Sequence, residues 1–140
     1  MNEIHFYDKN RKVVMSLYDF SLNNGNEPTI KFSVDISYLF YKAFHIIEDY
    51  KIYFESFLKE LNLLYENKRM IAQFIPIERQ LEIYFKQVEF GHIDVCIKLN
   101  NFYIDYTMYQ SALIINYNID QSFLPELIGE ISTVLKFANT

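Results

Sequence analysis

The stretch DQSFLPELIGEISTVLKF, residues 120–137, predicts an amphipathic helix around which the rest of the chain is organised. Its apolar side chains recur at helical spacing and form one stripe, which consists of Leu124, Leu127, Ile128, Ile131, Val134 and Leu135. We expect Ser122 rather than Asp120 to cap this helix, because Pro125 then falls in the first turn, where a missing N–H costs little. The stripe requires an apolar partner surface, which the preceding segments must supply.

Segments in which polar and apolar residues alternate precede this helix and predict β-strands. They cover residues 4–7, 12–20, 29–37, 70–75, 80–87, 92–100 and 111–119. In the second of these segments, Val13, Met15 and Leu17 are expected on one face. The run 38–47 is apolar on both sides, which predicts either a central strand or a covered continuation of the strand before it. Turns are expected at Asn24-Gly25 and at Gly91.

A second helix is predicted over residues 49–67 by an apolar stripe of its own, which consists of Phe54, Phe57, Leu58, Leu61, Leu64 and Tyr65. Runs of strands with short reversals indicate an α+β fold, a mainly antiparallel β-sheet with two helices packed on one face. A chain of 140 residues, 51% of them hydrophobic, fits one domain. Residues 1–28 are expected to form an N-terminal β-meander ahead of a core over residues 29–140. The sequence contains no internal repeat of convincing period.

The formal net charge is −5, and residues 71–140 hold eight Asp or Glu against four Lys or Arg. An acidic surface repels phosphate backbones and anionic lipid, so we expect neither nucleic-acid nor membrane binding, whereas a basic protein partner would be attracted. Cys96 is the single cysteine, which precludes an intrachain disulfide. The first residues also lack the apolar segment of a signal peptide, so we expect a cytoplasmic protein.

Three residues that alternate along one predicted strand, His92, Asp94 and Cys96, place their side chains on the same face. Metal ligands or a Cys–His pair can be built in this way, which makes a small ligand-binding or enzymatic domain the alternative function. One strand supplies too few ligands, however, and Glu89 and Asp94 disfavour a reactive thiolate. We therefore predict no metal, no cofactor and no enzymatic activity, and a face with a solvated acid and a small buried thiol.

Acidic residues of the second half are also candidates for a pair of catalytic carboxylates: Glu78, Glu82, Glu89, Asp94, Asp105 and Asp120. A catalytic pair needs a defined separation, which the sequence specifies for no two of them. We therefore predict that they belong to a solvated face and that none is catalytic.

Rigid aromatic rings are concentrated in the segment 100–109, which contains Tyr103, Asp105, Tyr106, Met108 and Tyr109. Tyrosine rings beside a carboxylate are typical of a protein-binding hot spot. Alternatively, the same rings cap the open end of the core. Both interpretations stay open at the level of sequence, and we predict the five residues as a partner-binding site.

Short motifs along the chain carry a family resemblance: FESFLKELNLL (54–64), LEIYF (81–85), GHIDVCIKL (91–99), ALIINYNI (112–119) and DQSFLPELIGEI (120–131). With these motifs, residues 30–137 resemble the WapI family of immunity proteins, which belong to bacterial polymorphic-toxin and contact-dependent growth inhibition systems. The N-terminal meander has no match in that pattern, and the tyrosine segment is particular to this chain.

The resemblance implies a small cytoplasmic antitoxin that binds the C-terminal toxin domain of an effector. Such a protein inhibits the toxin stoichiometrically and performs no chemistry of its own. A basic nuclease toxin would suit the acidic charge, because opposite charges speed association. The identity of the toxin does not follow from the resemblance.

In the tyrosine segment, Tyr103→Ala and Asp105→Lys are expected to weaken binding of the toxin partner and to leave the melting temperature near wild type. Interface side chains contribute to binding rather than to the core. Calorimetric titration and thermal melts of both variants measure the two quantities. Unchanged affinity in both variants would remove this segment from the interface.

Overall fold

The computed structural model describes residues 2–102 and 110–138 and confirms the α+β class. Its elements are β1 (Ile4–Tyr7), β2 (Val13–Asn23), β3 (Thr29–Tyr38), β4 (Tyr41–Tyr50), α1 (Lys51–Tyr65), β5 (Ile71–Phe74), β6 (Leu81–Gln87), β7 (His92–Phe102), β8 (Gln110–Asp120) and α2 (Leu124–Ala138), with short 3-10 turns at Glu89–Gly91 and Gln121–Phe123.

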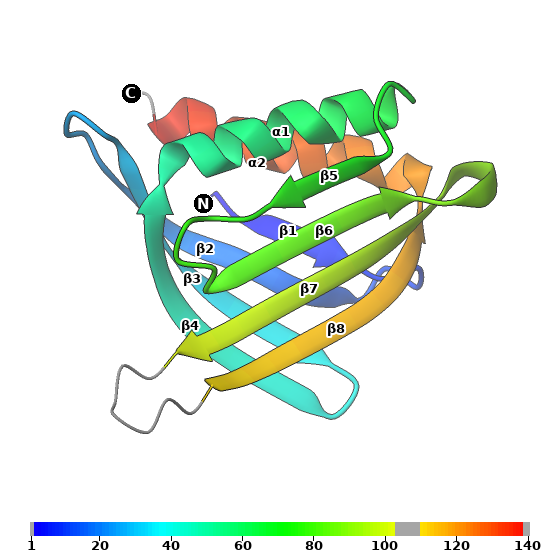
Figure 1. The fold of residues 1–140 in the computed structure, drawn as a ribbon, viewed down its shortest axis with the longest axis horizontal. Coiled ribbons are helices and arrows are strands. Elements are labelled where there is room, and N and C mark those ends of the chain that lie inside the picture. The colour runs from blue at the N-terminus through cyan, green and yellow to red at the C-terminus, as the bar shows by residue number, and fades with distance from the viewer. Residues whose placement is uncertain (1, 103–109, 139–140) are drawn as a thin grey trace.

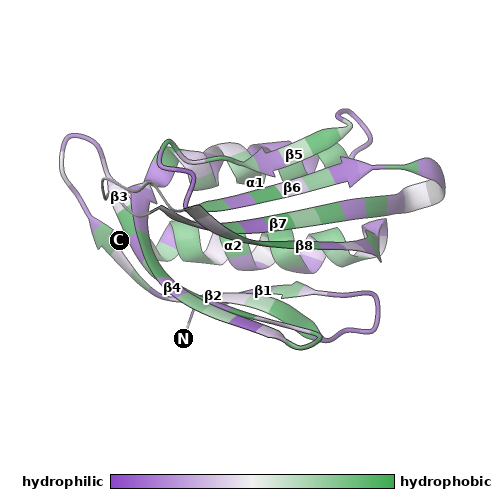
Figure 2. Cartoon of the chain, turned by 60° about the horizontal axis from the view of Figure 1, so that its bottom comes forward, coloured by the Kyte–Doolittle hydropathy of each residue, from purple (hydrophilic) through white to green (hydrophobic). Residues whose placement is uncertain are grey.

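The strands are divided between two antiparallel sheets, where the sequence pattern predicted a single one. The N-terminal sheet has the order β1-β2-β3-β4 and the C-terminal sheet the order β5-β6-β7-β8, so each is a simple meander. Figure 2 shows β1–β4 as one curved layer that is separate from β5–β8, with hydrophobic and hydrophilic residues alternating along the strands. The N-terminal meander is therefore an integral part of the first sheet.

The order of elements repeats although the sequence does not: four strands and a 15-residue helix occur twice. The two helices lie side by side along one side of the molecule (Figure 1). Each helix packs against the first strand of the opposite half, α1 against β5 and α2 against β1. This reciprocal packing joins the two sheets across one pair of edges.

The interior is one hydrophobic cluster with members from both sheets and both helices. The predicted stripe of α2 is confirmed, since Leu124, Leu127, Ile131, Val134 and Leu135 are buried and Ile128 packs against the cluster. On α1, Phe54, Phe57, Leu61 and Leu64 are buried, whereas the predicted Tyr65 is exposed. Asn67 follows α1 with φ 58, the left-handed conformation in which asparagine commonly ends a helix.

Two register shifts alter which residues of β2 face inward. A shift opposite Phe6 and Tyr7 leaves Val13 exposed and buries Val14 instead. The predicted position of Val13 is therefore wrong, whereas Met15 and Leu17 are buried as expected. A second shift lies between Tyr18 and Ser21, where Asp19 has φ 54, and turns a different set of residues inward. Beyond it, the ring of Phe20 stacks on Phe32 with centroids 5.7 Å apart.

The run 38–47 is neither a central strand nor a continuation of the strand before it. Leu39 and Phe40 form a two-residue turn, and β4 then returns along β3 as the edge strand of the sheet. Its even-numbered residues face outward, so the apolar side chains of Phe44 and Ile46 are exposed rather than covered. An edge strand with an apolar outer face has the same composition as a buried strand, which explains the error.

The predicted cap of the last helix is wrong as well. Asp120 is the capping residue instead of Ser122. Its carboxylate accepts a hydrogen bond from the backbone N–H of Ser122 at 2.9 Å. A 3-10 turn over Gln121–Phe123 is inserted before α2, so Asp120 caps this turn and Pro125 still falls in the first turn of α2. Within the described ranges, no helix has the length and apolar character needed to cross a membrane.

Phe57 connects α1 to the C-terminal sheet, since its ring lies 6.0 Å from that of Phe74 and 5.9 Å from that of Phe85. Because the side chain is only 1% exposed, Phe57→Ala should lower the free energy of unfolding by about 3–5 kcal/mol. Ile52→Ala on the same helix, where the side chain is 63% exposed, should change it by less than about 0.5 kcal/mol. Urea unfolding of both variants measures the difference, and equal effects would contradict this packing.

Candidate protein-binding site

The predicted face of β7 lies on the outer surface of the C-terminal sheet. His92 and Asp94 are exposed and Cys96 is half-buried. Burial raises the pKa of the Cys96 thiol, and the nearby Lys98 offsets this only in part, so the neutral thiol is favoured. In the part of the chain that the structure describes, no three His, Cys, Asp or Glu side chains are grouped so that they could hold a metal ion.

Among the candidate carboxylates, Glu82 has a different environment from the others. It is 7% exposed, and its two oxygens accept hydrogen bonds from the Tyr84 hydroxyl at 2.6 Å and the Asn100 amide at 2.8 Å. Burial and the hydrogen bond to Glu82 raise the pKa of Tyr84 to about 12. Both oxygens of Glu82 are thus engaged within the sheet, and the remaining described candidates are exposed: Glu78, Glu89, Asp94 and Asp120.

The partner-binding residues predicted from sequence lie outside the described residues: Tyr103, Asp105, Tyr106, Met108 and Tyr109. Their role stays a prediction.

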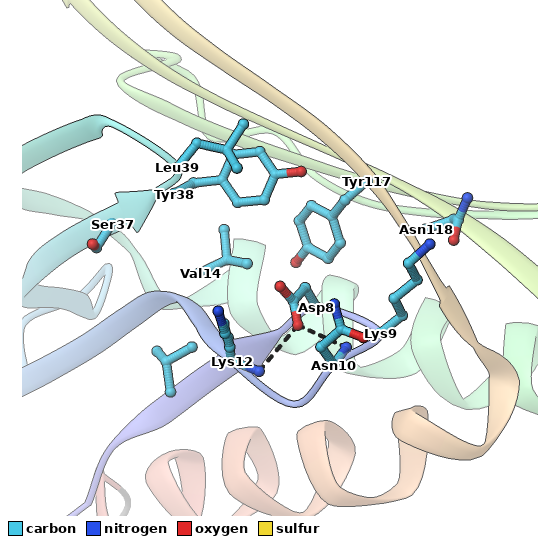
Figure 3. Close-up of a pocket in the computed structure, with 11 residues that line it drawn as sticks. Asp8, Lys9, Asn10, Lys12, Val14, Ser37, Tyr38, Leu39, Tyr117 and Asn118 are labelled. Carbon is cyan, nitrogen blue, oxygen red and sulfur yellow. Dashed lines mark hydrogen bonds between the residues drawn. The ribbon is translucent and has the colours of Figure 1, made fainter.

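The structure forms a concave site elsewhere, where the turn between β1 and β2, the turn between β3 and β4, and strand β8 converge (Figure 3). We call it the hairpin cleft. Its volume is about 610 Å³. Its lining residues are Asp8, Lys9, Asn10, Lys12, Val13, Val14, Ser37, Tyr38, Leu39, Tyr117 and Asn118. Segments that are far apart in the sequence therefore build one surface.

Two tyrosines form a wall of the hairpin cleft. The rings of Tyr38 and Tyr117 lie 6.1 Å apart at an interplanar angle of 33°. Figure 3 shows the hydroxyl of Tyr117 directed toward Asp8. Burial raises the pKa of Tyr117, and the nearby charges of Asp8 and Tyr38 raise it further, so its hydroxyl stays protonated and can donate a hydrogen bond.

Asp8 orders the β1–β2 turn on the other side of the cleft. Its Oδ1 accepts hydrogen bonds from the backbone N–H groups of Asn10 at 2.8 Å and Lys12 at 3.0 Å. Arg11 adopts φ 64, and its N–H bonds to the backbone oxygen of Asp8 at 3.0 Å. Lys9 and Lys12 are consequently held on an ordered turn, and both side chains are exposed.

The β3–β4 turn, from which Leu39 lines the cleft, carries the two most exposed large apolar residues of this region. Leu39 is 77% and Phe40 100% exposed. Leu39 also has φ 55, a left-handed conformation that costs about 1–2 kcal/mol for a residue with a Cβ atom. Turns of this kind favour Gly, Asn or Asp at such a position, so the leucine is unfavourable both for its backbone and for its exposure.

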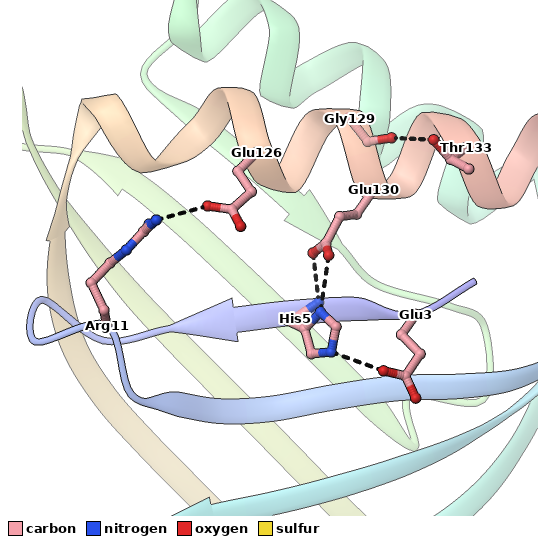
Figure 4. Close-up of polar contacts among 7 residues, drawn as sticks. All are labelled: Glu3, His5, Arg11, Glu126, Gly129, Glu130 and Thr133. Atoms are coloured by element: carbon pink, nitrogen blue, oxygen red, sulfur yellow. Dashed lines mark hydrogen bonds and ion pairs between the residues drawn. The ribbon is translucent and has the colours of Figure 1, made fainter. Parts of the chain in front are cut away.

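The β1–β2 hairpin is attached to α2 by polar contacts (Figure 4). The backbone N–H and the Nδ1 atom of His5 each lie 2.9 Å from a carboxylate oxygen of Glu130, and Nε2 lies 3.1 Å from Glu3. Burial lowers the pKa of His5, but hydrogen bonds and charges of Glu130 and Glu3 outweigh burial, so the net pKa is raised. These contacts fix β1, and through it the β1–β2 turn of the cleft.

A second attachment lies at the turn itself. The guanidinium of Arg11 lies 3.1 Å from the carboxylate of Glu126 on α2 and lies over the rings of Tyr7 and Phe123, at 5.3 and 5.0 Å from their centroids. Stacking on two rings restricts the guanidinium more than a surface ion pair alone would. The β1–β2 hairpin, whose turn forms one side of the hairpin cleft, is therefore attached to α2 at two points.

Sequence reasoning missed the hairpin cleft because it missed the β3–β4 turn. The sequence Tyr38-Leu39-Phe40-Tyr41 contains none of the residues that usually mark a turn. The burial pattern reverses between β3, where the even residues from 30 to 36 are buried, and β4, where the odd residues from 43 to 49 are buried or half-buried. Such a reversal is the mark of a two-residue hairpin, because paired residues share a face. The sequence of β4 does not show this reversal, because apolar residues occur at its odd and even positions alike.

No family model matches the sequence, and no curated protein or solved structure is significantly similar to the chain.

The His5–Glu130 contact predicts a measurable titration. The pKa of His5 should lie above 6.5, so its contribution to the free energy of unfolding is complete below pH 6.5 and is lost as the pH rises through the folded-state pKa. Glu130→Gln should lower the pKa of His5, whereas Glu126→Gln, which removes the partner of Arg11, should leave it close to wild type. NMR titration of the His5 ring in the three proteins measures this, and a His5 pKa insensitive to Glu130→Gln would contradict the contact.

Proposed function

We propose that this protein is an immunity protein that binds the C-terminal toxin domain of a bacterial polymorphic toxin and inhibits it stoichiometrically through the hairpin cleft and the Leu39–Phe40 turn. The observation that supports the proposal is the pair of exposed apolar side chains on the turn that borders a concave site. Exposed apolar residues beside a concave polar surface are typical of protein-binding sites.

The chemistry of the cleft suits a peptide surface. Burial of Leu39 and Phe40 by a partner would each contribute about 1.5–3 kcal/mol before the costs of association. Lys9 and Lys12 supply ammonium donors for carboxylate or carbonyl oxygens of the partner. The hydroxyl of Tyr117 adds a directional donor within the cleft. Apolar anchors on the rim and polar groups inside thus give both affinity and orientation.

The site is preorganised, which favours tight inhibition. The Asp8 hydrogen bonds order one turn, and the other turn has only two residues between paired strands. A rigid site loses less conformational entropy when it binds, so more of the contact energy appears as affinity. The left-handed conformation of Leu39 is also consistent with a role outside folding, because strained residues concentrate at functional sites.

The resemblance to the WapI family supports the choice of partner, since members of that family neutralise toxin domains. The net charge of −5 supports a basic toxin such as a nuclease, because long-range attraction raises the rate of encounter. This attraction comes from the chain as a whole, since the hairpin cleft holds two lysines and one aspartate. An inhibitor needs only to cover the substrate-binding surface of the toxin, so inhibition requires no catalytic group on this chain.

Binding and protection can be tested together. The toxin domain encoded in the neighbouring upstream reading frame should arrest growth when expressed alone, and co-expression of this protein should restore growth. The purified proteins should form a stoichiometric complex on size-exclusion chromatography. A toxic domain that is neither bound nor neutralised would refute the proposal.

Substitutions in the turn separate binding from folding. Phe40→Ser should weaken toxin binding at least about tenfold, which corresponds to about 1.4 kcal/mol. Leu39→Asn should weaken binding too, yet leave the free energy of unfolding unchanged or raise it by about 1 kcal/mol, because asparagine tolerates a positive φ. Ile77→Ser, which removes a 69% exposed side chain from the β5–β6 connection, serves as the control with normal binding. Wild-type affinity in both turn variants would exclude the turn from the interface.

A further inference from the structure

Strand β4 offers a free sheet edge. The helices lie along β1 and β5, one edge strand of each sheet, whereas β4 pairs with β3 alone among the described residues. Strand β8 does not pair with this edge in the part of the chain that the structure describes, and Ala43–His45 line a cavity of about 340 Å³ together with residues near the ends of β7 and β8. Unpaired strand edges present backbone donors and acceptors that readily pair with another strand.

The hydrogen-bond pattern identifies the free backbone groups. The N–H of Lys51 bonds to the backbone oxygen of Pro28 at 2.9 Å, and the β3–β4 register continues from this pair without a shift. Bonded pairs alternate along an antiparallel ladder, so the odd residues of β4 bond to β3 and the even residues direct their N–H and C=O groups to the free edge. The backbone N–H of Tyr50 is taken by the Asp49 carboxylate at 2.8 Å, which ends the free run at Glu48.

Four residues therefore combine free backbone groups with outward side chains: Lys42, Phe44, Ile46 and Glu48. All four side chains are exposed, Phe44 to 60% and Ile46 to 50%. Their order along the strand is cation, apolar, apolar, anion, and the apolar pair lies at the centre. Read in the opposite direction, this order is complementary to itself.

We propose that β4 pairs antiparallel with β4 of a second copy of this chain, about a twofold axis at His45. Lys42 then lies opposite Glu48 of the second copy, and Phe44 opposite its Ile46; the symmetry generates each contact twice. All of these pairs are of the hydrogen-bonded type, so each exchanges two backbone hydrogen bonds. The two N-terminal sheets become one continuous sheet.

Neighbouring registers lack this complementarity. An axis at Phe44 places Lys42 opposite Ile46 of the second copy, and an axis at Ile46 places Phe44 opposite Glu48. Each of these registers leaves the charges without an opposite partner, and cross-strand pairs contribute most when aromatic, branched or oppositely charged residues face each other. The self-complementary order thus specifies both the partner and the register.

The proposal is independent of toxin binding, because the pairing spans Lys42–Glu48 and the Leu39–Phe40 turn lies beyond it. An edge-to-edge contact buries less surface than a typical stable interface of about 1,600 Å², so we expect a dissociation constant on the order of 10 µM. Sedimentation equilibrium of the purified protein across this concentration should show a monomer–dimer equilibrium. A monomer well above this concentration would overturn the proposal.

Charge reversal tests the pairing. Lys42→Glu and Glu48→Lys each place like charges opposite one another twice, so each variant should dimerise roughly tenfold more weakly than wild type. An equimolar mixture of the two variants should regain wild-type affinity, because the heterodimer restores both pairs. No gain on mixing would overturn the proposed register, and the monomeric variants act as their own folding controls by circular dichroism.

Cysteine cross-linking tests the axis directly. In a Cys96→Ser background, His45→Cys should form a disulfide-linked dimer on oxidation, because residue 45 faces itself across the axis at a distance that a disulfide spans. Ala43→Cys is the matched control, since residue 43 faces Ile47 of the second copy and should not cross-link. Efficient cross-linking at 43 and none at 45 would contradict the proposed axis. No toxin enters these measurements, so their failure and failure of the proposed function are distinguishable.

Discussion

The reciprocal packing of each helix against the first strand of the opposite half is the constraint on which the remaining structure depends. Neither sheet could bury its inner face alone, because a four-stranded meander has one apolar face and needs a second layer. Phe57 on α1 meets Phe74 on β5 and Phe85 on β6, so the helix of the first half completes the core of the second. On the other side, Glu130 of α2 holds His5 of β1. The two halves are thereby made into one core.

This packing also decides where the molecule remains open. A helix can cover one sheet edge, and both helices are used on β1 and β5, so β4 and β8 are left on the opposite side. The turns that join the strands of the N-terminal sheet consequently approach β8 without pairing to it, and the hairpin cleft lies between them. Both the concave site and the free edge follow from how the helices are placed.

The sequence predicted what depends on local periodicity and failed where the answer depends on neighbours. The stripes of α1 and α2 and nearly all strands were recognised, because each needs only the spacing of apolar residues. Strand β4 was misjudged, since exposure of Phe44 and Ile46 depends on which strand lies beside them and not on their own spacing. The prediction of the cap of α2 failed because Asp120 and Ser122 are equally good capping residues. An inserted 3-10 turn places Asp120 at the capping position. The hairpin cleft could not be predicted at all, since it joins three separate connections.

The repeated architecture gives an internal comparison that periodicity could not supply. Counted back from the last residues of β4 and β8, Ile46 corresponds to Asn116 and Glu48 to Asn118. Both asparagines are exposed, so the scaffold accepts polar residues at these edge positions. Folding therefore does not require an apolar residue at position 46, and polar or charged residues are the usual protection of an edge strand. Phe44 corresponds to Ile114, which is 53% exposed, so β4 departs from its counterpart at position 46 and not at position 44. The exposed Ile46 is consistent with the proposed pairing of β4 with a second copy of this chain, and the exposed Leu39 and Phe40 are consistent with the proposed contact with a toxin.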